Sequence, residues 1–168
     1  MARVFFDTNV LVYTADNRDE RKQRIARNLI KGTLNGRLDG WISVQTLSEF
    51  INSTLNKLKL PLDKVDGFLD FFDNLPIVNP DRALPRRGLE IKNRYDIQFY
   101  DAMMVAAAER AGANEFYTED LNDGQLYGSV RAVNPFKDID APSRPVVYAE
   151  LKRQQEGQQE GQAQTIQS

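Results

Sequence analysis

Cysteine and histidine are both absent from the 168 residues of this sequence. Without cysteine, the chain has no disulfides, no thiolate zinc site and no cysteine nucleophile. Without histidine, it also lacks the Ser-His-Asp and Cys-His mechanisms and the commonest general base. Any catalysis must therefore use carboxylates, lysine, tyrosine, hydroxyl groups or a metal ion held by oxygen atoms.

A strong net charge and long apolar runs are missing as well. The 22 basic and 24 acidic residues leave a formal charge of −2, so nucleic-acid binding would need a local basic patch. No apolar run approaches the roughly 20 residues that a membrane-spanning helix requires. We therefore expect a soluble, cytoplasmic protein without a membrane segment, of a length that suits one main domain.

Strand-like and helix-like segments alternate over residues 1–136, as they do in α/β folds. The expected strands lie at 4–6, 41–44, 77–78, 115–118 and 129–133, and the expected helices lie at 19–35, 45–58, 62–74, about 82–94, and from 100 to a stop at Gly112. This order predicts a mostly parallel sheet of about five strands with helices on both faces. Residues 137–168 form an extension whose Gln/Gly-rich end is predicted to be disordered, because it lacks apolar side chains.

Four acidic residues lie where a ligand site is expected in such a fold. Asp7 follows the first strand and Asp120 follows the fourth, and ligands bind outside the carboxyl ends of parallel strands. Asp101 opens the most apolar helix, and Glu49 lies one turn into the helix after the second strand. If the first and fourth strands are parallel neighbours, these carboxylates share one edge of the sheet.

Each acid also has a purely structural interpretation. Asp7 would serve as the N-cap of a following helix, and Asp101 would compensate a helix dipole in the first turn. Asp120 and Asp123 fit an Asx turn that ends in glycine. Glu49 lies nearly opposite the apolar stripe of its helix, so periodicity alone predicts that it faces solvent.

Converging carboxylates would need a cation. Two carboxylates about 4 Å apart repel each other by several kcal/mol, which raises a pKa or recruits a metal ion. Oxygen ligands without histidine favour Mg²⁺ or Mn²⁺, and such an ion would activate water and offset charge on a phosphate. We predict that the ligands are Asp7, Asp101, Asp120 and Glu49, with Glu49 alternatively acting as base, and that the groups fixing their rotamers are Thr8, Asn9, Thr118 and Asp123.

Around these acids the sequence resembles the PIN-domain family, in particular the bacterial VapC-like toxins, over residues 3–136. The resemblance is carried by the strand before Asp7-Thr8-Asn9 and by segments 45–52 with Glu49, 99–108 with Asp101, 118–125 with Asp120, and 133–136 at the domain end. It implies a three-layer α/β/α fold and a Mg²⁺- or Mn²⁺-dependent endoribonuclease that leaves a 5′-phosphate and a 3′-hydroxyl. It also implies a homodimer and a small antitoxin protein that blocks the site. In this pattern Asp120 is the fourth acid, and Glu119 is a surface neighbour.

RNA binding would need basic contacts, and two clusters are candidates for a phosphate track: Arg18, Arg21, Lys22, Arg24 and Arg27, and then Arg82, Arg86, Arg87, Lys92 and Arg94. A solvated helix face is the alternative for each cluster. An aromatic group of Phe68, Phe71 and Phe72 fits a core or a dimer surface better than base stacking. Three other functions stay open: an RNA-maturation nuclease without a toxin role, a non-catalytic RNA- or protein-binding module, and a phosphatase with an aspartate nucleophile. The phosphatase pattern needs a second aspartate where Asn9 stands.

Overall fold

The structure, a computed structural model, describes residues 1–137; the rest of the predicted extension, including its Gln/Gly-rich tail, lies outside the described residues. In chain order the elements are β1 (Arg3–Phe6), α1 (Thr8–Ala15), α2 (Glu20–Leu34), β2 (Asp39–Ser43), α3 (Val44–Asn56), α4 (Leu62–Phe72), β3 (Ile77–Val78), α5 (Ala83–Tyr95), α6 (Phe99–Arg110), β4 (Glu115–Tyr117), β5 (Leu126–Tyr127) and β6 (Val130–Val133). Every strand and helix predicted from the sequence has a counterpart, with small shifts at the ends.

The central sheet has six strands in the order β3-β2-β1-β4-β6-β5. All neighbouring pairs are parallel except β5 with β6, so the prediction of a mostly parallel sheet is confirmed. The predicted strand number is one too low, because β5 was missed. This strand has only two residues, Leu126 and Tyr127, and is too short to show an alternating pattern.

Helix α1 was also missed, because its apolar residues continue the hydrophobic character of β1 without a glycine or proline between them. The side chain of Asp7 accepts a hydrogen bond from the backbone N–H of Thr8 at 2.7 Å, and the backbone turns into the helix there. Val10 and Leu11 are then fully buried on the helix. The N-cap interpretation of Asp7 is therefore confirmed, and it places the carboxylate at the end of β1.

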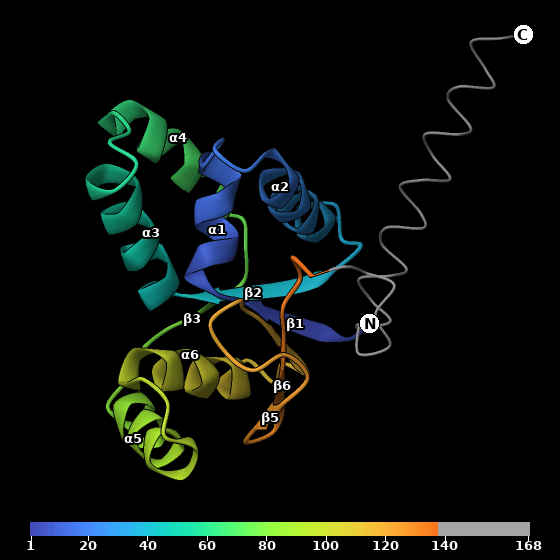
Figure 1. Ribbon diagram of the computed structural model, residues 1–168, viewed down its shortest axis with the longest axis vertical. Helices are drawn as coiled ribbons and strands as arrows, with labels where there is room; N and C mark the ends of the chain where they lie inside the picture. Colours follow the sequence, from blue (N-terminus) through green and yellow to red (C-terminus); the bar gives the residue numbers. More distant parts are fainter. Residues whose placement is uncertain (138–168) are drawn as a thin grey trace, which may run out of the picture.

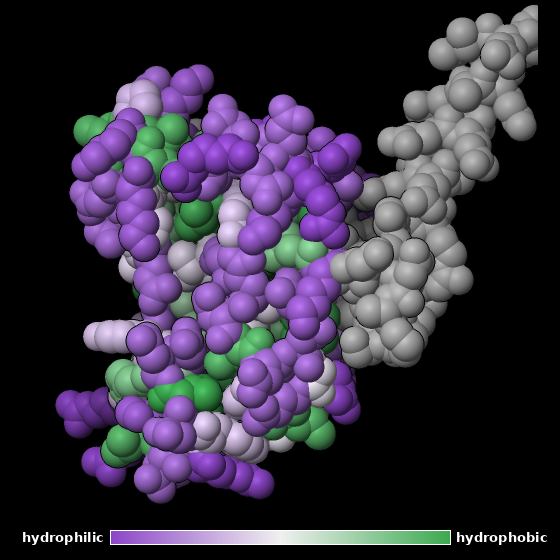
Figure 2. Space-filling view, in the orientation of Figure 1, coloured by the Kyte–Doolittle hydropathy of each residue, from purple (hydrophilic) through white to green (hydrophobic). Residues whose placement is uncertain are grey.

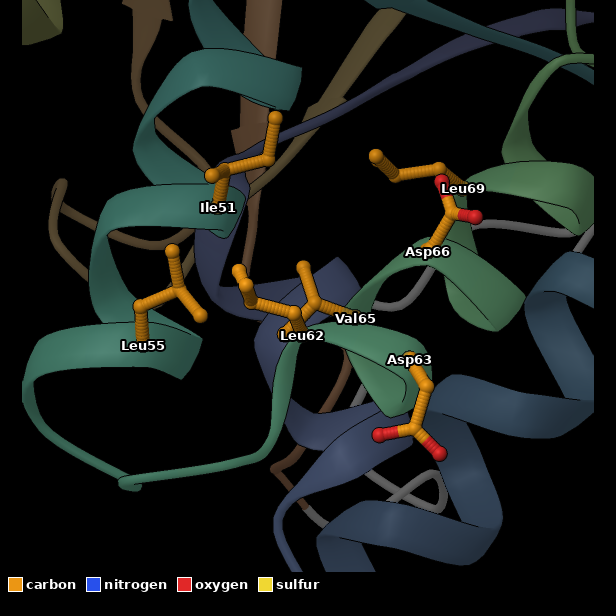
Figure 3. A pocket seen from close by; sticks show the side chains of 7 residues that line it. All are labelled: Ile51, Leu55, Leu62, Asp63, Val65, Asp66 and Leu69. Atoms are coloured by element: carbon orange, nitrogen blue, oxygen red, sulfur yellow. The ribbon is translucent and has the colours of Figure 1, made fainter.

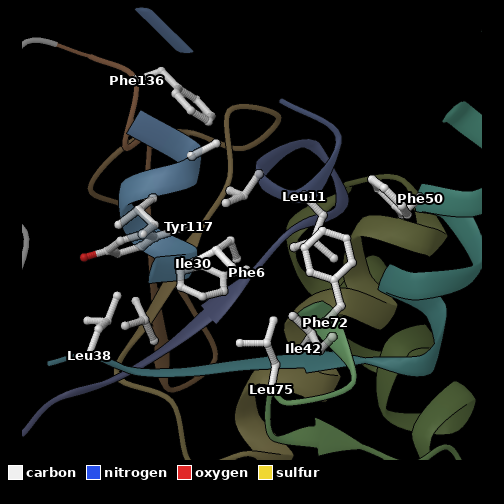
Figure 4. Close-up of a cluster of buried hydrophobic side chains, with 14 of the residues drawn as sticks. Phe6, Leu11, Ile30, Leu38, Ile42, Phe50, Phe72, Leu75, Tyr117 and Phe136 are labelled. Atoms are coloured by element: carbon white, nitrogen blue, oxygen red, sulfur yellow. The ribbon is translucent and has the colours of Figure 1, made fainter. Parts of the chain in front are cut away.

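The molecule has three layers. Helices α1 to α4 cover one face of the sheet, and α5 and α6 cover the other (Figure 1). Successive side chains of β1 point to opposite faces of the sheet, so Phe6 packs in the core beneath α1 to α4 and Phe5 in the core beneath α5 and α6. Figure 4 shows the first core, to which Phe6 belongs together with Leu11, Phe50 and Phe72. This is the predicted three-layer α/β/α sandwich.

The surface in the view of Figure 2 is mostly hydrophilic, with apolar side chains gathered where α3 and α4 meet and again over α5 and α6. Exposed apolar residues of these helices include Leu62 and Phe71 on α4 and Leu89 on α5. Within residues 1–137, no helix is long and apolar enough to cross a membrane.

Candidate active site

The edge of the sheet beyond β1 and β4 holds a cavity of about 320 Å³ that brings the predicted acids together. Strands β1 and β4 are parallel neighbours in which Phe6 lies opposite Tyr117, so the residues that follow them emerge side by side. The cavity is lined by Asp7, Glu49, Asp101 and Asp120, together with Thr8 and Asn9. Four segments far apart in the sequence thus supply carboxylates to one space.

Asp7 forms the floor of this cavity and is only 5% exposed. Its two oxygens accept hydrogen bonds from the N–H of Thr8 at 2.7 Å and from the hydroxyl of Thr118 at 2.5 Å. Burial raises the pKa of Asp7, the Thr118 hydrogen bond lowers it, and the negative charge of Asp120 raises it again, to a value of about 7. The carboxylate is therefore rigidly held in surroundings that disfavour its charge.

Asp101 and Asp120 flank Asp7 from two other segments. Asp101 lies in the first turn of α6, and burial followed by the charges of Asp120 and Glu49 raises its pKa to about 6. The Asp120 carboxylate accepts a hydrogen bond from the Asn9 amide at 3.1 Å. The four acids form no ion pair with a basic side chain within the described chain. Within residues 1–137, their negative charge is therefore not neutralised by a direct ion pair.

Glu49 faces this cavity from α3, whereas periodicity predicted a solvent-facing side chain. One carboxylate oxygen accepts from the hydroxyl of Thr8 at 2.8 Å, and the other accepts from the amide of Gln45 at 2.7 Å. Sequence reasoning missed Gln45, although its position four residues before Glu49 on one helix was a usable signal. Of the predicted supporting residues, Thr8, Asn9 and Thr118 all contact the acids.

Asp123, predicted as a supporting residue, is wrong for this role. It does not line the cavity, because its carboxylate accepts from the backbone N–H of Asn134 at 2.8 Å and pairs with Lys137 at 3.3 Å. It therefore fastens the end of the domain after β6. Glu119, expected to be a surface neighbour, is partly exposed, and its carboxylate pairs with Lys22 at 2.7 Å and accepts a hydrogen bond from the Tyr13 hydroxyl.

Several members of the two predicted basic clusters are held by other groups of the protein. In the first cluster, Arg21 donates to the carbonyl of Phe136, Arg27 donates to the carbonyl of Thr14, and Lys22 is paired with Glu119. In the second cluster, Arg87 pairs with Glu90 and Glu109, and no member of that cluster lines the acidic cavity. Arg18 is the one member of either cluster in the cavity lining.

Two other cavities lie among the helices. One of about 320 Å³ lies between α3 and α4, where the side chains of Ile51, Leu55, Leu62 and Val65 face one another and Asp66 lies at the margin (Figure 3). The second, of about 290 Å³, lies between α2 and α4 and includes Phe68, Phe71 and Phe72 in its lining. Phe72 is a core residue, as predicted for this aromatic group, while Phe71 is 61% exposed. Both linings are mostly apolar, although Asp63 and Asp66 line the first cavity and Arg27 and Lys31 line the second.

The donor chemistry of the acidic cavity suits a hard divalent cation. All of its acidic groups are oxygen ligands, which Mg²⁺ and Mn²⁺ prefer. Burial, and after it the charges of neighbouring acids, raises the pKa of Asp7 and of Asp101, so a bound cation would favour their charged forms. As the side chains are placed, no three acids within residues 1–137 converge closely enough to form a finished metal site. The carboxylates are instead held by Thr8, Thr118 and Asn9.

A family model of the PIN domain matches residues 4–123, a segment that contains all four acids. The chain belongs to the PIN domain family. Membership in this family supports a nuclease function, and it agrees with the sheet-edge position of the acids. No curated protein sequence gives a significant match to this PIN domain.

Solved structures share the fold. A toxin–antitoxin complex from Klebsiella pneumoniae is 21% identical, with a TM-score of 0.58, and covers 79% of this chain and 97% of its own. DNA-bound VapBC from Salmonella typhimurium is also 21% identical, with a TM-score of 0.57 over 79% of this chain and 97% of its own. Mycobacterium tuberculosis VapC20, described as a sarcin-ricin loop cleaving toxin, is 17% identical, with a TM-score of 0.55. The match covers 76% of this chain and 98% of the VapC20 chain. At these identities the likeness shows that this PIN domain has the fold of VapC proteins.

Proposed function

We propose that this PIN domain is a Mg²⁺- or Mn²⁺-dependent endoribonuclease of the VapC type. The observation that carries the proposal is the meeting of Asp7, Glu49, Asp101 and Asp120 in one cavity, without a basic ion-pair partner among the described residues. Maintaining several like charges in a partly buried space is unfavourable for the fold, so their presence there favours a functional role. Family membership supports the same conclusion.

Asp7, Asp101 and Asp120 are the proposed metal ligands, with Glu49 as a fourth ligand or as the base. A bound divalent ion would supply a reactive nucleophile from water at neutral pH and offset the charge that develops on the phosphate. Thr118 and the N–H of Thr8 fix the rotamer of Asp7, which reduces the reorganisation needed on binding.

Glu49 is positioned to accept a proton as a general base. Its oxygens accept hydrogen bonds from Thr8 and Gln45, so the carboxylate has a defined orientation toward the cavity. In the proposed reaction Glu49 accepts a proton from water as the water oxygen bonds to phosphorus. The bond from phosphorus to the 3′ oxygen breaks, and that oxygen takes a proton from solvent, which leaves a 5′-phosphate and a 3′-hydroxyl. The hydrogen bond from Thr8 links this carboxylate to the residue that directly follows Asp7.

Cleavage of RNA by the purified full chain tests the proposal. We expect cleavage with Mg²⁺ or Mn²⁺, none with EDTA, and a loss of at least about a hundredfold in Asp101→Asn, because this variant removes one carboxylate while keeping the shape of the side chain. Asp63→Asn, which changes an exposed acid on α4, is the matched control. The proposal fails if wild type does not cleave RNA with either ion, or if Asp101→Asn cleaves as well as Asp63→Asn.

The toxin role and the partners are separate parts of the proposal. The structural neighbours include a toxin–antitoxin complex and a VapBC complex, which supports an antitoxin partner for this chain. A homodimer is a further part of the proposal and is implied by the family resemblance alone. Induction in cells should arrest growth and produce a few discrete 5′-phosphate ends. Trimmed precursors without arrest would instead show an RNA-maturation nuclease, and light scattering of the purified chain would measure the oligomeric state.

A further inference from the structure

The acidic cavity has a second, basic part. Its lining includes Arg18 from the segment between α1 and α2 and Lys57 from the end of α3. An adjoining cavity of about 180 Å³ shares Asp16, Arg18, Lys57 and Leu58 with it. The two spaces therefore form one groove, which runs from the acids past two cations toward the loop after α3.

Arg18 is held in this groove by a buried carboxylate. Its Nε and Nη2 atoms donate to the two oxygens of Asp16 at 2.9 and 2.7 Å, and its backbone N–H donates to Asp16 at 3.1 Å. Asp16 is 7% exposed, whereas the Arg18 side chain is 73% exposed. A guanidinium has five N–H donors, so this arrangement fixes the group while leaving donors open to a ligand.

Lys57 contributes the second cation. It is the C-cap residue of α3 and is exposed, and its ammonium forms no hydrogen bond or ion pair with the described part of the protein. Its position would also offset the helix dipole, which is the structural alternative. That alternative does not account for its place in the lining of the same groove as Arg18.

We propose that Arg18 and Lys57 bind phosphates of an unpaired RNA strand whose neighbouring phosphate lies at the four acids, with Asp16 as the positioning residue for Arg18. This inference rests on the proposed ribonuclease function and extends it to the path of the substrate. A nucleic-acid strand carries a phosphate at every nucleotide, so one strand in the groove meets the acids and the cations together. The planar guanidinium suits phosphate oxygens, and the aliphatic Leu58 and Leu60 offer contacts to sugars or base edges.

Salt-dependent binding is the first test. A fluorescently labelled, unstructured oligoribonucleotide is titrated into full-length Asp101→Asn protein between about 50 and 200 mM salt. Each phosphate contact on a single strand contributes about −0.7 to the slope of log K against log salt concentration. Arg18→Ala and Lys57→Ala should therefore each make the slope less negative by about that amount. The matched controls Arg24→Ala and Lys64→Ala remove exposed charges outside the groove and should leave the slope unchanged.

Cleavage kinetics in the otherwise unaltered protein are the second test. Arg18→Ala should raise KM roughly tenfold with a smaller effect on kcat, as expected when a charge-assisted contact to the substrate is lost. Asp16→Asn should raise KM less than this, and Arg18→Lys should restore only part of the loss, because lysine cannot pair bidentately with Asp16. Thermal unfolding of each variant separates these effects from a loss of folded protein.

The outcomes distinguish this inference from the proposed function. If wild type cleaves RNA and the Arg18 and Lys57 variants match their controls in slope and KM, the groove is not the substrate path, although the nuclease proposal stands. If wild type does not cleave RNA, but Arg18→Ala and Lys57→Ala make the slope of log K against log salt less negative as expected, the groove binds RNA and the nuclease proposal fails. Variants that change only the binding of a partner protein, with RNA binding unaltered, would assign the groove to a protein and overturn the inference.

Discussion

Replacing Asp7 with asparagine should stabilise the protein at alkaline pH in the absence of divalent ions. Asparagine keeps an oxygen that can accept the N–H of Thr8, so the N-cap of α1 survives the change. What it removes is the negative charge, which burial and the nearby Asp120 disfavour. The same change should abolish the proposed cleavage, so stability and activity should move in opposite directions.

The magnitude follows from the pKa of Asp7, which is raised from 3.8 to about 7. Each pKa unit corresponds to about 1.4 kcal/mol, so ionisation lowers the stability of the fold by at most about 4 kcal/mol. Because the folded state holds this proton more tightly than the unfolded state, stability falls as the pH rises from about 4 to about 7 and is level above that. Asp7→Asn should therefore gain roughly 1–4 kcal/mol at pH 8 and almost nothing near pH 4.

Urea unfolding of both proteins in EDTA across this pH range provides the measurement, with Asp63→Asn as a control for loss of an exposed carboxylate. Adding Mg²⁺ or Mn²⁺ should then stabilise wild type more than Asp7→Asn, since an ion that binds only the folded state shifts the equilibrium toward it. If Asp7→Asn is less stable than wild type at pH 8 in EDTA, or if the difference does not depend on pH, the reasoning about a strained buried charge is refuted.

Three further changes test other parts of the structure. Thr118→Val removes the hydroxyl that donates to Asp7, so it should raise the pKa of Asp7 further. We expect the free energy of unfolding at pH 8 to fall by about 1–3 kcal/mol, and an unchanged dependence of stability on pH would contradict this. Gly40→Ala places a Cβ 2.3 Å from the Thr33 hydroxyl and 2.5 Å from the Phe6 ring. We expect urea unfolding to show a loss of about 1–3 kcal/mol in stability, and an unchanged stability would show that α2 can shift. Phe50→Ala empties a fully buried site and should lower stability by about 3–5 kcal/mol, whereas the 61% exposed Phe71→Ala should change it little; equal effects would refute the core assignment.

Local patterns in the sequence were sufficient for the order of strands and helices. Short apolar runs bounded by polar or glycine residues mark β1, β2 and β4, and the apolar stripe of α3 was visible from its spacing. Helix α1 was missed because Val10 and Val12 are β-branched and favour strands. The helix forms because Asp7 caps it and because it packs against α2 and α3.

The candidate site was predictable where the acid directly follows a strand. Asp7 is fixed to the sheet edge by its covalent connection to β1, and Thr118 by its connection to β4, so parallel pairing of these strands brings them together. Glu49 was not predictable from periodicity, because the side of α3 that faces away from the core lies next to Thr8 of α1. The family pattern pointed to this residue, and the helix packing supplies the physical reason.

Neighbours along the chain are enough to predict most strands and helices, the types of ligand atom available and the position of the acids relative to strand ends. Only the tertiary structure decided which charges meet. Asp123 and Glu119 lie close to Asp120 in the sequence, yet they form ion pairs with Lys137 and Lys22. Of the arginines in the two basic clusters, Arg18 alone lines the acidic cavity. Electrostatic and hydrogen-bonding partners lie up to 115 positions apart in the described chain, and such pairings are set by how the layers pack.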